Sequence, residues 1–175
     1  MRSVVAVVVV VALSACHGEP LGGACEPPDG AVVVPNEGWV HKNDAVDHVY
    51  VSNPPASGPH YPVWAGWEIH DDVVERGQWV HNLEHGGIIL LIGDSASTEA
   101  EEELRAGYDA IPNDEECGHR RALLTRDPEL DDAVAVVAAD HLLIPGGLDG
   151  NALSVERIVE FAQACRNHSH ESICY

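Results

Sequence analysis

Four prolines fall in the segment 53–62, and they constrain the chain more than any other feature of the sequence. They are Pro54, Pro55, Pro59 and Pro62. A proline ring fixes φ at about −65° and removes a backbone donor, so this segment can be neither a helix nor a central strand. We expect a stiff arm with a turn at Ser57-Gly58. This arm presents His60 from a backbone that has little conformational entropy left to lose.

A second constrained block, residues 81–86, reads His-Asn-Leu-Glu-His-Gly. In a β-strand, His81 and His85 would point to one face but lie about 13 Å apart. On a helical turn the same spacing brings their Cβ atoms to about 5–6 Å. That separation is within chelating range, and Glu84 would lie on the same side. If a metal binds here, residues 79–85 must therefore form a short helical turn or a tight loop, and the glycine that follows is well placed to end a helix.

The two blocks together predict a metal site. Its proposed ligands are His60, His81 and His85, with Glu84 and His48 as further candidates. Three imidazoles, with or without a carboxylate, suit a divalent zinc or copper ion. The single methionine is Met1, which disfavours a carrier of soft Cu(I). No sequence context assigns a role to His17, His41, His119 or His141.

Two other functions stay open. The pattern His-x-x-Glu-His also matches a zinc hydrolase signature, in which Glu84 would be the general base that activates water. That signature needs a long helix, whereas Gly77 and Gly86-Gly87 leave room for about two turns. Alternatively, the domain binds a peptide or a sugar without metal, in a groove lined by Trp64, Trp67 and Trp79.

The N-terminus has the features of a bacterial lipoprotein signal. Arg2 precedes an apolar run, 4–13, that is too short to span a bilayer as a mature helix. Residues 13–16, Leu-Ser-Ala-Cys, resemble a lipobox, which implies cleavage before Cys16 and attachment of diacylglycerol to its sulfur. We therefore expect a signal peptide at 1–15. The mature protein would be anchored by lipid in the bacterial cell envelope, facing the periplasm or the exterior.

Charge and cysteines narrow the partners and the compartment. The formal net charge of −20 argues against nucleic acid and against electrostatic attraction to anionic lipid. The expected membrane contact is therefore the N-terminal lipid. Besides Cys16, the cysteines are Cys25, Cys117, Cys165 and Cys174. An even number in an oxidising compartment predicts two disulfides, and the sequence leaves all three pairings open.

The mature chain of about 160 residues is long enough for one domain with its own core. We place a linker at 16–30, the domain at 31–166 and a loose polar tail at 167–175. Strands are predicted at 31–34, 47–51, 88–92, 121–125 and 133–138. Apolar spacing predicts one helix from Thr98 to the residue before Pro112, and another from Ser154 to Cys165.

The order of these elements predicts an α+β fold in a single domain, with a mixed β-sheet and two helices packed on one face. Thioredoxin-like and ferredoxin-like halves both show this order. The pattern does not separate them.

The two blocks also resemble those of a known family. Residues 53–61 and 81–86 are similar to the signature blocks of an uncharacterised bacterial family, domain of unknown function 3105. The resemblance takes in His48-Val49 and extends to about Phe161. It implies that motif positions are occupied by His48, His60, His81, Glu84 and His85. Because the family has no established activity, the resemblance supports the site and not a particular reaction.

Overall fold

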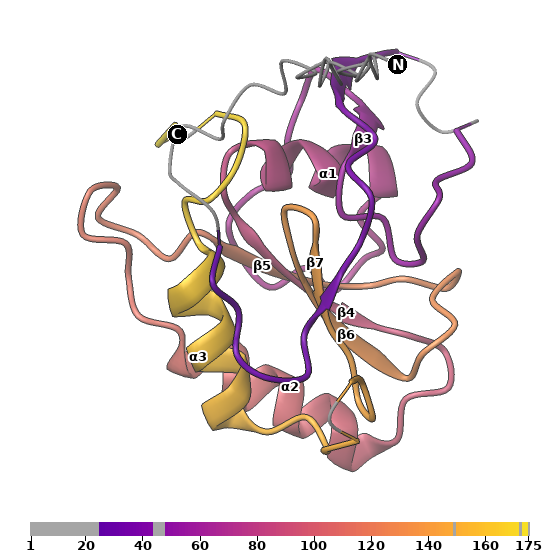
Figure 1. The fold of residues 1–175 in the computed structure, drawn as a ribbon, viewed down its shortest axis with the longest axis vertical. Helices are drawn as coiled ribbons and strands as arrows, with labels where there is room; N and C mark the ends of the chain where they lie inside the picture. The colour runs from indigo at the N-terminus through magenta and orange to yellow at the C-terminus, as the bar shows by residue number, and fades with distance from the viewer. Residues whose placement is uncertain (1–24, 44–47, 149, 172, 175) are drawn as a thin grey trace, which may run out of the picture.

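A five-stranded mixed sheet forms the centre of the molecule (Figure 1). The computed structural model describes residues 25–43, 48–148, 150–171, 173 and 174. The predicted signal peptide 1–15 and Cys16 lie outside these residues. No helix in the described part is long and apolar enough to cross a membrane.

The elements match the predicted class, a single-domain α+β fold. The strands of the main sheet are β1 (Val32–Val33), β4 (Ile88–Ile92), β5 (Ala122–Arg126), β6 (Val134–Ala138) and β7 (His141–Leu143). A separate pair consists of β2 (Trp39–His41) and β3 (Gly58–His60). The helices are α1 (Arg76–Glu84), α2 (Thr98–Ala110) and α3 (Val155–Cys165).

The strand order of the main sheet is β1-β7-β6-β4-β5. β4 and β5 are parallel and the other described neighbours are antiparallel, so the sheet is mixed, as predicted. β4, α2 and β5 form a parallel crossover unit, and the β6–β7 hairpin leads to α3.

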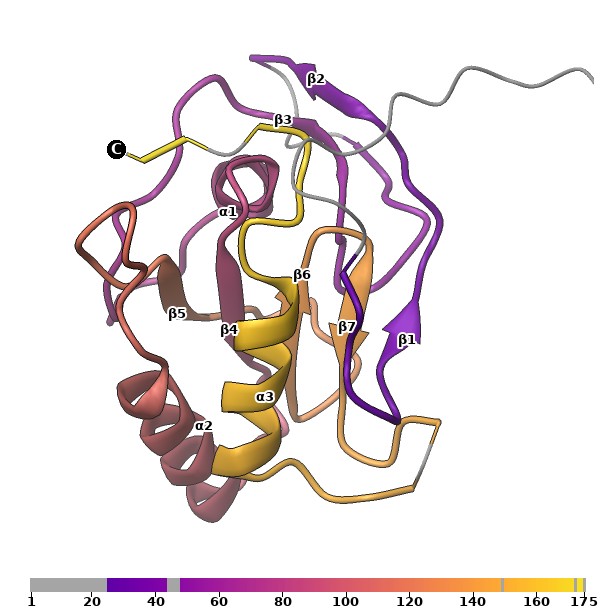
Figure 2. The ribbon, with the colours of Figure 1, turned by 60° about the vertical axis from the view of Figure 1, so that its left-hand side comes forward.

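The central strand β4 is a continuous apolar run buried on both faces. Alternate side chains, beginning with Ile88, join the core that β4 forms with α2 and α3. The intervening Ile89 and Leu91 pack on the opposite face, in one core with Trp79 and Leu83 of α1. Two helices therefore cover one face, as predicted, and α1 covers the other (Figure 2).

Local signals set the helix starts. Ser97 caps α2, since its hydroxyl accepts from Ala100 N at 3.2 Å. The cap thus lies one residue before the predicted Thr98. Ser154 caps α3 as predicted and accepts from Arg157 N at 3.4 Å.

The predicted strand at 47–51 does not form where it is described. Val51 is exposed, and its backbone N–H donates to Glu37 Oε1 at 2.9 Å instead of to a neighbouring strand. Tyr50 turns inward, where its hydroxyl donates to Pro59 O at 2.7 Å. The alternating pattern therefore belongs to a loop that polar contacts anchor.

Two disulfides tie both ends of the described chain to the domain. They join Cys25 to Cys165 and Cys117 to Cys174, with Cα–Cα distances of 4.7 and 5.1 Å. Both distances are ordinary for disulfides. The structure thus fixes a pairing that the sequence left open.

The C-terminal tail is not loose, contrary to the prediction. Asn167 N donates to Gly86 O at 3.0 Å, and Glu171 N donates to Glu84 O at 2.9 Å. The tail lies with β2 and β3 on the side of α1 that faces away from the sheet (Figures 1 and 2). Backbone hydrogen bonds and a disulfide hold it there, and neither leaves an apolar pattern in the sequence.

Candidate metal centre

The pairing of β2 with β3 brings two histidines together. The strands are parallel, with His41 opposite His60 in the register, and the two imidazole centroids lie 4.9 Å apart. The arm requires a glycine just before this point. Gly58 has φ +122°, and a Cβ there would lie 2.9 Å from Tyr50 Cε1. Residues 53–62 therefore present His60 from a constrained backbone, as predicted.

α1 brings a second pair of histidines together. His81 and His85 lie one turn apart, with their Nε2 atoms 2.8 Å from each other. Trp79 and Leu83 are fully buried in the core. Gly86 follows the C-cap residue with φ +74°. The predicted helical turn is thus confirmed, and the helix begins before the expected start of that turn.

Four side chains converge on the outer side of α1. Ligand atoms within 4.8 Å of one another are offered by His41, His60, His81 and Glu84. Glu84 Oε2 lies 3.0 Å from the Nε2 atom of His60, 3.1 Å from that of His41 and 3.8 Å from that of His81. The His41 side chain is 52% exposed, and the other three are buried. Three nitrogens and one oxygen at these separations could hold a metal ion.

Hydrogen bonds from Nδ1 to backbone carbonyls orient two of the imidazoles, those of His60 and His81. A carbonyl can only accept, so His60 Nδ1 donates to Gly58 O at 2.8 Å, and His81 Nδ1 donates to Tyr61 O at 2.6 Å. In neutral rings, both Nε2 lone pairs then face the cluster. A bond of this kind commonly fixes the tautomer and the direction of a metal-binding histidine.

Burial and neighbouring charges set the protonation of the site. Burial lowers the pKa of His81, although its hydrogen bond to the Tyr61 carbonyl opposes this. Burial also lowers the pKa of His85, and the proximity of His81 acts in the same direction. Burial alone would raise the pKa of Glu84, but hydrogen bonds and charges from His60 and His41 lower it to about 2. At neutral pH, Glu84 is therefore anionic and the two α1 imidazoles are neutral, which are the forms that bind cations.

The structure brings most of the sequence-predicted residues together. His60, His81 and Glu84 belong to the cluster, and His85 touches it through His81. His41 belongs to it as well and was missed. Its only local signal is the alternation of Trp39, Val40 and His41, which is too short to mark a strand. The register with β3 places this histidine in the cluster.

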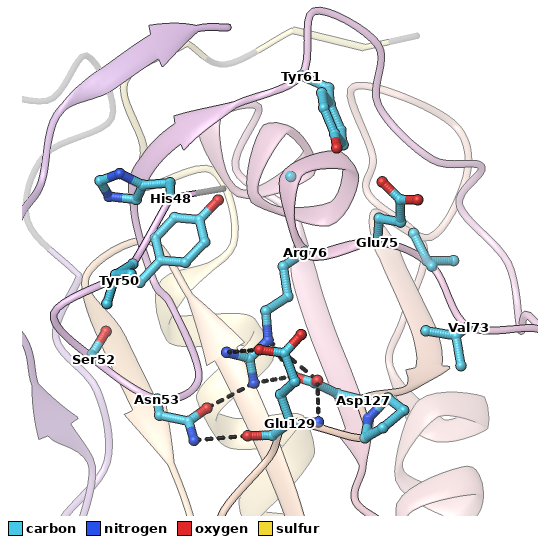
Figure 3. A pocket seen from close by; sticks show the side chains of 14 residues that line it. His48, Tyr50, Ser52, Asn53, Tyr61, Val73, Glu75, Arg76, Asp127 and Glu129 are labelled. Carbon is cyan, nitrogen blue, oxygen red and sulfur yellow. Dashed lines mark hydrogen bonds and ion pairs between the residues drawn. The ribbon is translucent and has the colours of Figure 1, made fainter. Parts of the chain in front are cut away.

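His48, in contrast, is not in the cluster. Its Nε2 lies 3.3 Å from Glu37 Oε2, and its ring packs edge-on against Tyr50 at 4.7 Å between centroids. It lines a separate cavity of about 460 Å³ next to the arm (Figure 3). The loop at 48–51 carries it there, because no strand forms that would direct it toward β3.

In that cavity, Arg76 has protein partners (Figure 3). Its Nε lies 3.2 and 3.0 Å from the two carboxylate oxygens of Asp127, and one Nη donates to Asn53 Oδ1 at 2.8 Å. This network joins the start of the arm to the start of α1 and the loop after β5. It therefore positions the two elements that carry His60 and His81.

The three tryptophans do not share a groove. Trp79 is fully buried in the core. Trp64 is half-buried and lies edge-on to both His81 and His85, with 5.5 Å between ring centroids. Trp67 covers Gly87, where any Cβ would clash with its ring. Of these three, only Trp64 thus lies beside the histidine cluster, and an open aromatic groove made of all three is excluded.

Fold and site together define a single-domain α+β protein with a buried His/Glu cluster that could hold a metal ion. A family model described as Protein of unknown function (DUF3105) matches residues 41–173, and the chain belongs to this family. The matched range contains all four cluster residues and most of the tail. No curated protein and no solved structure matches the chain.

Proposed function

We propose that this protein is a lipid-anchored protein of the bacterial cell envelope that binds a divalent metal ion, zinc or copper. The ligands would be His41, His60, His81 and Glu84. This set revises the one proposed from the sequence: His41 joins, His48 leaves, and His85 lies beside the set.

One observation carries the proposal. His60 Nε2 lies 3.0 Å from Glu84 Oε2, and the bond from His60 Nδ1 to Gly58 O leaves Nε2 without a proton in a neutral ring. Two bare acceptors do not sit at hydrogen-bond distance unless a proton or a cation lies between them. His41 Nε2 approaches the same oxygen at 3.1 Å. The convergence of these nitrogen atoms on one buried carboxylate oxygen therefore favours the binding of a positively charged species between them.

The donor set supports zinc or copper over softer or harder ions. Imidazole suits both metals, and a single carboxylate is compatible with either. The four described cysteines are held in disulfides, so they offer no thiolate to a soft ion.

The hydrolase alternative is less well supported. A general base must be free to take a proton from the attacking water. Glu84 Oε2 instead lies within 3.1 Å of two imidazole nitrogens, as a ligand would. α1 has nine residues, which is short for the helix that this signature uses.

Metal analysis tests the proposal directly. Protein equilibrated with Zn²⁺ or Cu²⁺ and then dialysed should retain the ion, and His60→Ala and His81→Ala should lose it. His48→Ala is the matched control, since this histidine was a sequence candidate that lies outside the cluster. Glu84→Gln should release the ion. If Glu84→Gln kept the ion but lost a hydrolytic activity, the general-base alternative would be favoured instead. A wild-type protein that folds and retains no metal would overturn the proposal.

The pH dependence gives a second test. Metal competes with protons for the imidazoles, so loading should fall below about pH 6.5. The lowered pKa of His81 moves that loss to more acidic pH. Occupancy that does not change with pH would contradict imidazole ligation.

The envelope location has its own test. Cys16→Ser should prevent lipid attachment and move the protein from the membrane fraction to the soluble one. Retention in the membrane fraction would contradict anchoring through this residue.

A further inference from the structure

We propose that a second divalent cation binds next to the first, held by His85 and Glu171 and shared through Glu84. This inference rests on the proposed function, because Glu84 would bridge the two ions. Ligand atoms of Glu84, His85 and Glu171 all lie within 4.8 Å of one another. Glu84 thus belongs to two ligand groups at once.

The carboxylate of Glu84 can serve both ions. A carboxylate has two oxygens and about four lone-pair directions, and Oε2 is the oxygen that approaches the three cluster imidazoles. His81 Nε2 and His85 Nε2 lie 2.8 Å apart, so the two ligand groups adjoin at the histidines as well as at the carboxylate. The proton shared between these two nitrogens would be released when the ions bind. Two-metal sites in proteins have ions about 3.5–4 Å apart, and neighbouring groups with a shared carboxylate suit that spacing.

The C-terminal tail places Glu171 at this point. Its backbone N–H donates to the carbonyl of Glu84, the last residue of α1, at 2.9 Å. Ser169 Oγ donates to Glu171 O at 3.2 Å, and the Cys117–Cys174 disulfide holds the tail beyond it. Glu171 is therefore fixed next to α1 by the backbone, and its carboxylate offers a ligand atom within 4.8 Å of those of Glu84 and His85.

The two sites differ in donor chemistry. Three imidazoles and one oxygen favour zinc or copper at the first. Two carboxylates and one imidazole at the second favour a harder or borderline divalent ion and tolerate several. We expect weaker and less selective binding there, because Glu171 is less buried than Glu84 and His85.

The test is the metal stoichiometry of the full chain, with Zn²⁺ as the titrant in equilibrium dialysis. Wild type should bind two ions. Glu171→Gln should bind one, which is a loss of half the metal at saturation. Glu160→Gln is the matched control, since Glu160 is an exposed glutamate on α3 outside both groups, and it should bind two ions.

Co²⁺ provides a readout that does not depend on counting. Two Co²⁺ ions that share a carboxylate are magnetically coupled, so the second equivalent should attenuate the EPR signal of the first in wild type. It should leave that signal intact in Glu171→Gln.

The outcomes separate this inference from the proposed function. One ion in both wild type and Glu171→Gln would overturn the second site and leave the first. No ion in folded wild type would overturn both. Loss of both ions in a Glu171→Gln protein with an unchanged near-ultraviolet CD spectrum would show that the tail serves the first site, and would also overturn the inference.

Discussion

The helices on the two faces of the sheet bury different kinds of side chain. On the α2/α3 face, the core positions Leu104, Ile158 and Phe161 are all apolar. α1 also places an apolar side against the sheet, but its opposite side is buried too, with His81 2% and Glu84 3% exposed. Burial of polar groups costs free energy unless each one is paired. Hydrophobic stabilisation therefore accounts for the cores on both faces of the sheet and does not account for the polar outer side of α1.

The same contrast separates two kinds of helix. α2 and α3 each leave one side to solvent, and their exposed sides carry charged residues. α1 lies between the sheet on one side and β2, β3 and the tail on the other (Figure 2). Burying the polar side of a short helix costs free energy. It also holds several ligand side chains at fixed separations.

The largest expected effect on stability comes from a substitution in the apolar core between the sheet and α2/α3. Phe161→Ala removes a fully buried ring and should lower the free energy of unfolding by about 3–5 kcal/mol. Urea unfolding should show the same loss with and without metal, and the folded variant should bind as much metal as wild type. A selective loss of metal binding would mean that the two faces are not independent.

Metal removal should affect only the polar side of α1, and its effect on the free energy of unfolding should be somewhat smaller. A ligand at about 100 times its Kd stabilises the fold by about 2.7 kcal/mol. Wild type should therefore lose about that amount of unfolding free energy when the metal is removed. The measurement is urea unfolding under two conditions, at a fixed free Zn²⁺ concentration and in the presence of a chelator. His81→Ala should show no difference between the two conditions, and a difference as large as that of wild type would exclude His81 as a ligand.

Acid should weaken the metal-free protein in a defined window. The pKa of Glu84 is about 2 in the fold against 4.5 for the ordinary group, so its contribution is complete above about pH 4.5 and is lost as pH falls toward 2. The pKa values of His81 and His85 are also lowered. These rings stay neutral in the fold while the unfolded chain takes up protons below about pH 6.5. The free energy of unfolding should therefore decline from about pH 6.5 downward.

Urea unfolding of wild type and Glu84→Gln from pH 7 to pH 3 checks this window. The pKa of Asp114 is also about 2, so wild type and variant share its contribution at low pH. The difference between the two proteins isolates Glu84 and should shrink below pH 4.5. A difference that is constant across the range would contradict the assigned pKa.

The smallest expected effect is that of His48→Ala. This side chain has one long polar contact, 3.3 Å to Glu37, and an edge-on contact with Tyr50, and the substitution should change the free energy of unfolding by about 0.5 kcal/mol or less. Metal stoichiometry should equal that of wild type. Loss of the ion in this variant would show that His48 is a ligand, so that the metal site extends to the loop at 48–51.

The sequence alone predicted the elements that local spacing defines. The continuous apolar run of β4, the apolar faces of α2 and α3 and the cap at Ser154 all lie in local pattern. The same is true of the helical turn that brings His81, Glu84 and His85 to one side. The prolines likewise restrict the arm whatever surrounds it, because each acts on its own φ angle.

Tertiary structure alone decided which distant residues join the site. His41 enters through the parallel register of β2 with β3, His48 is excluded because its loop pairs with Glu37, and Glu171 reaches α1 through backbone bonds of the tail. Register and backbone hydrogen bonds between distant segments leave no periodic mark on a sequence, since every residue offers the same N–H and C=O groups. Spacing and the prolines could therefore predict His60, His81 and Glu84, and only the folded chain could supply His41 and Glu171.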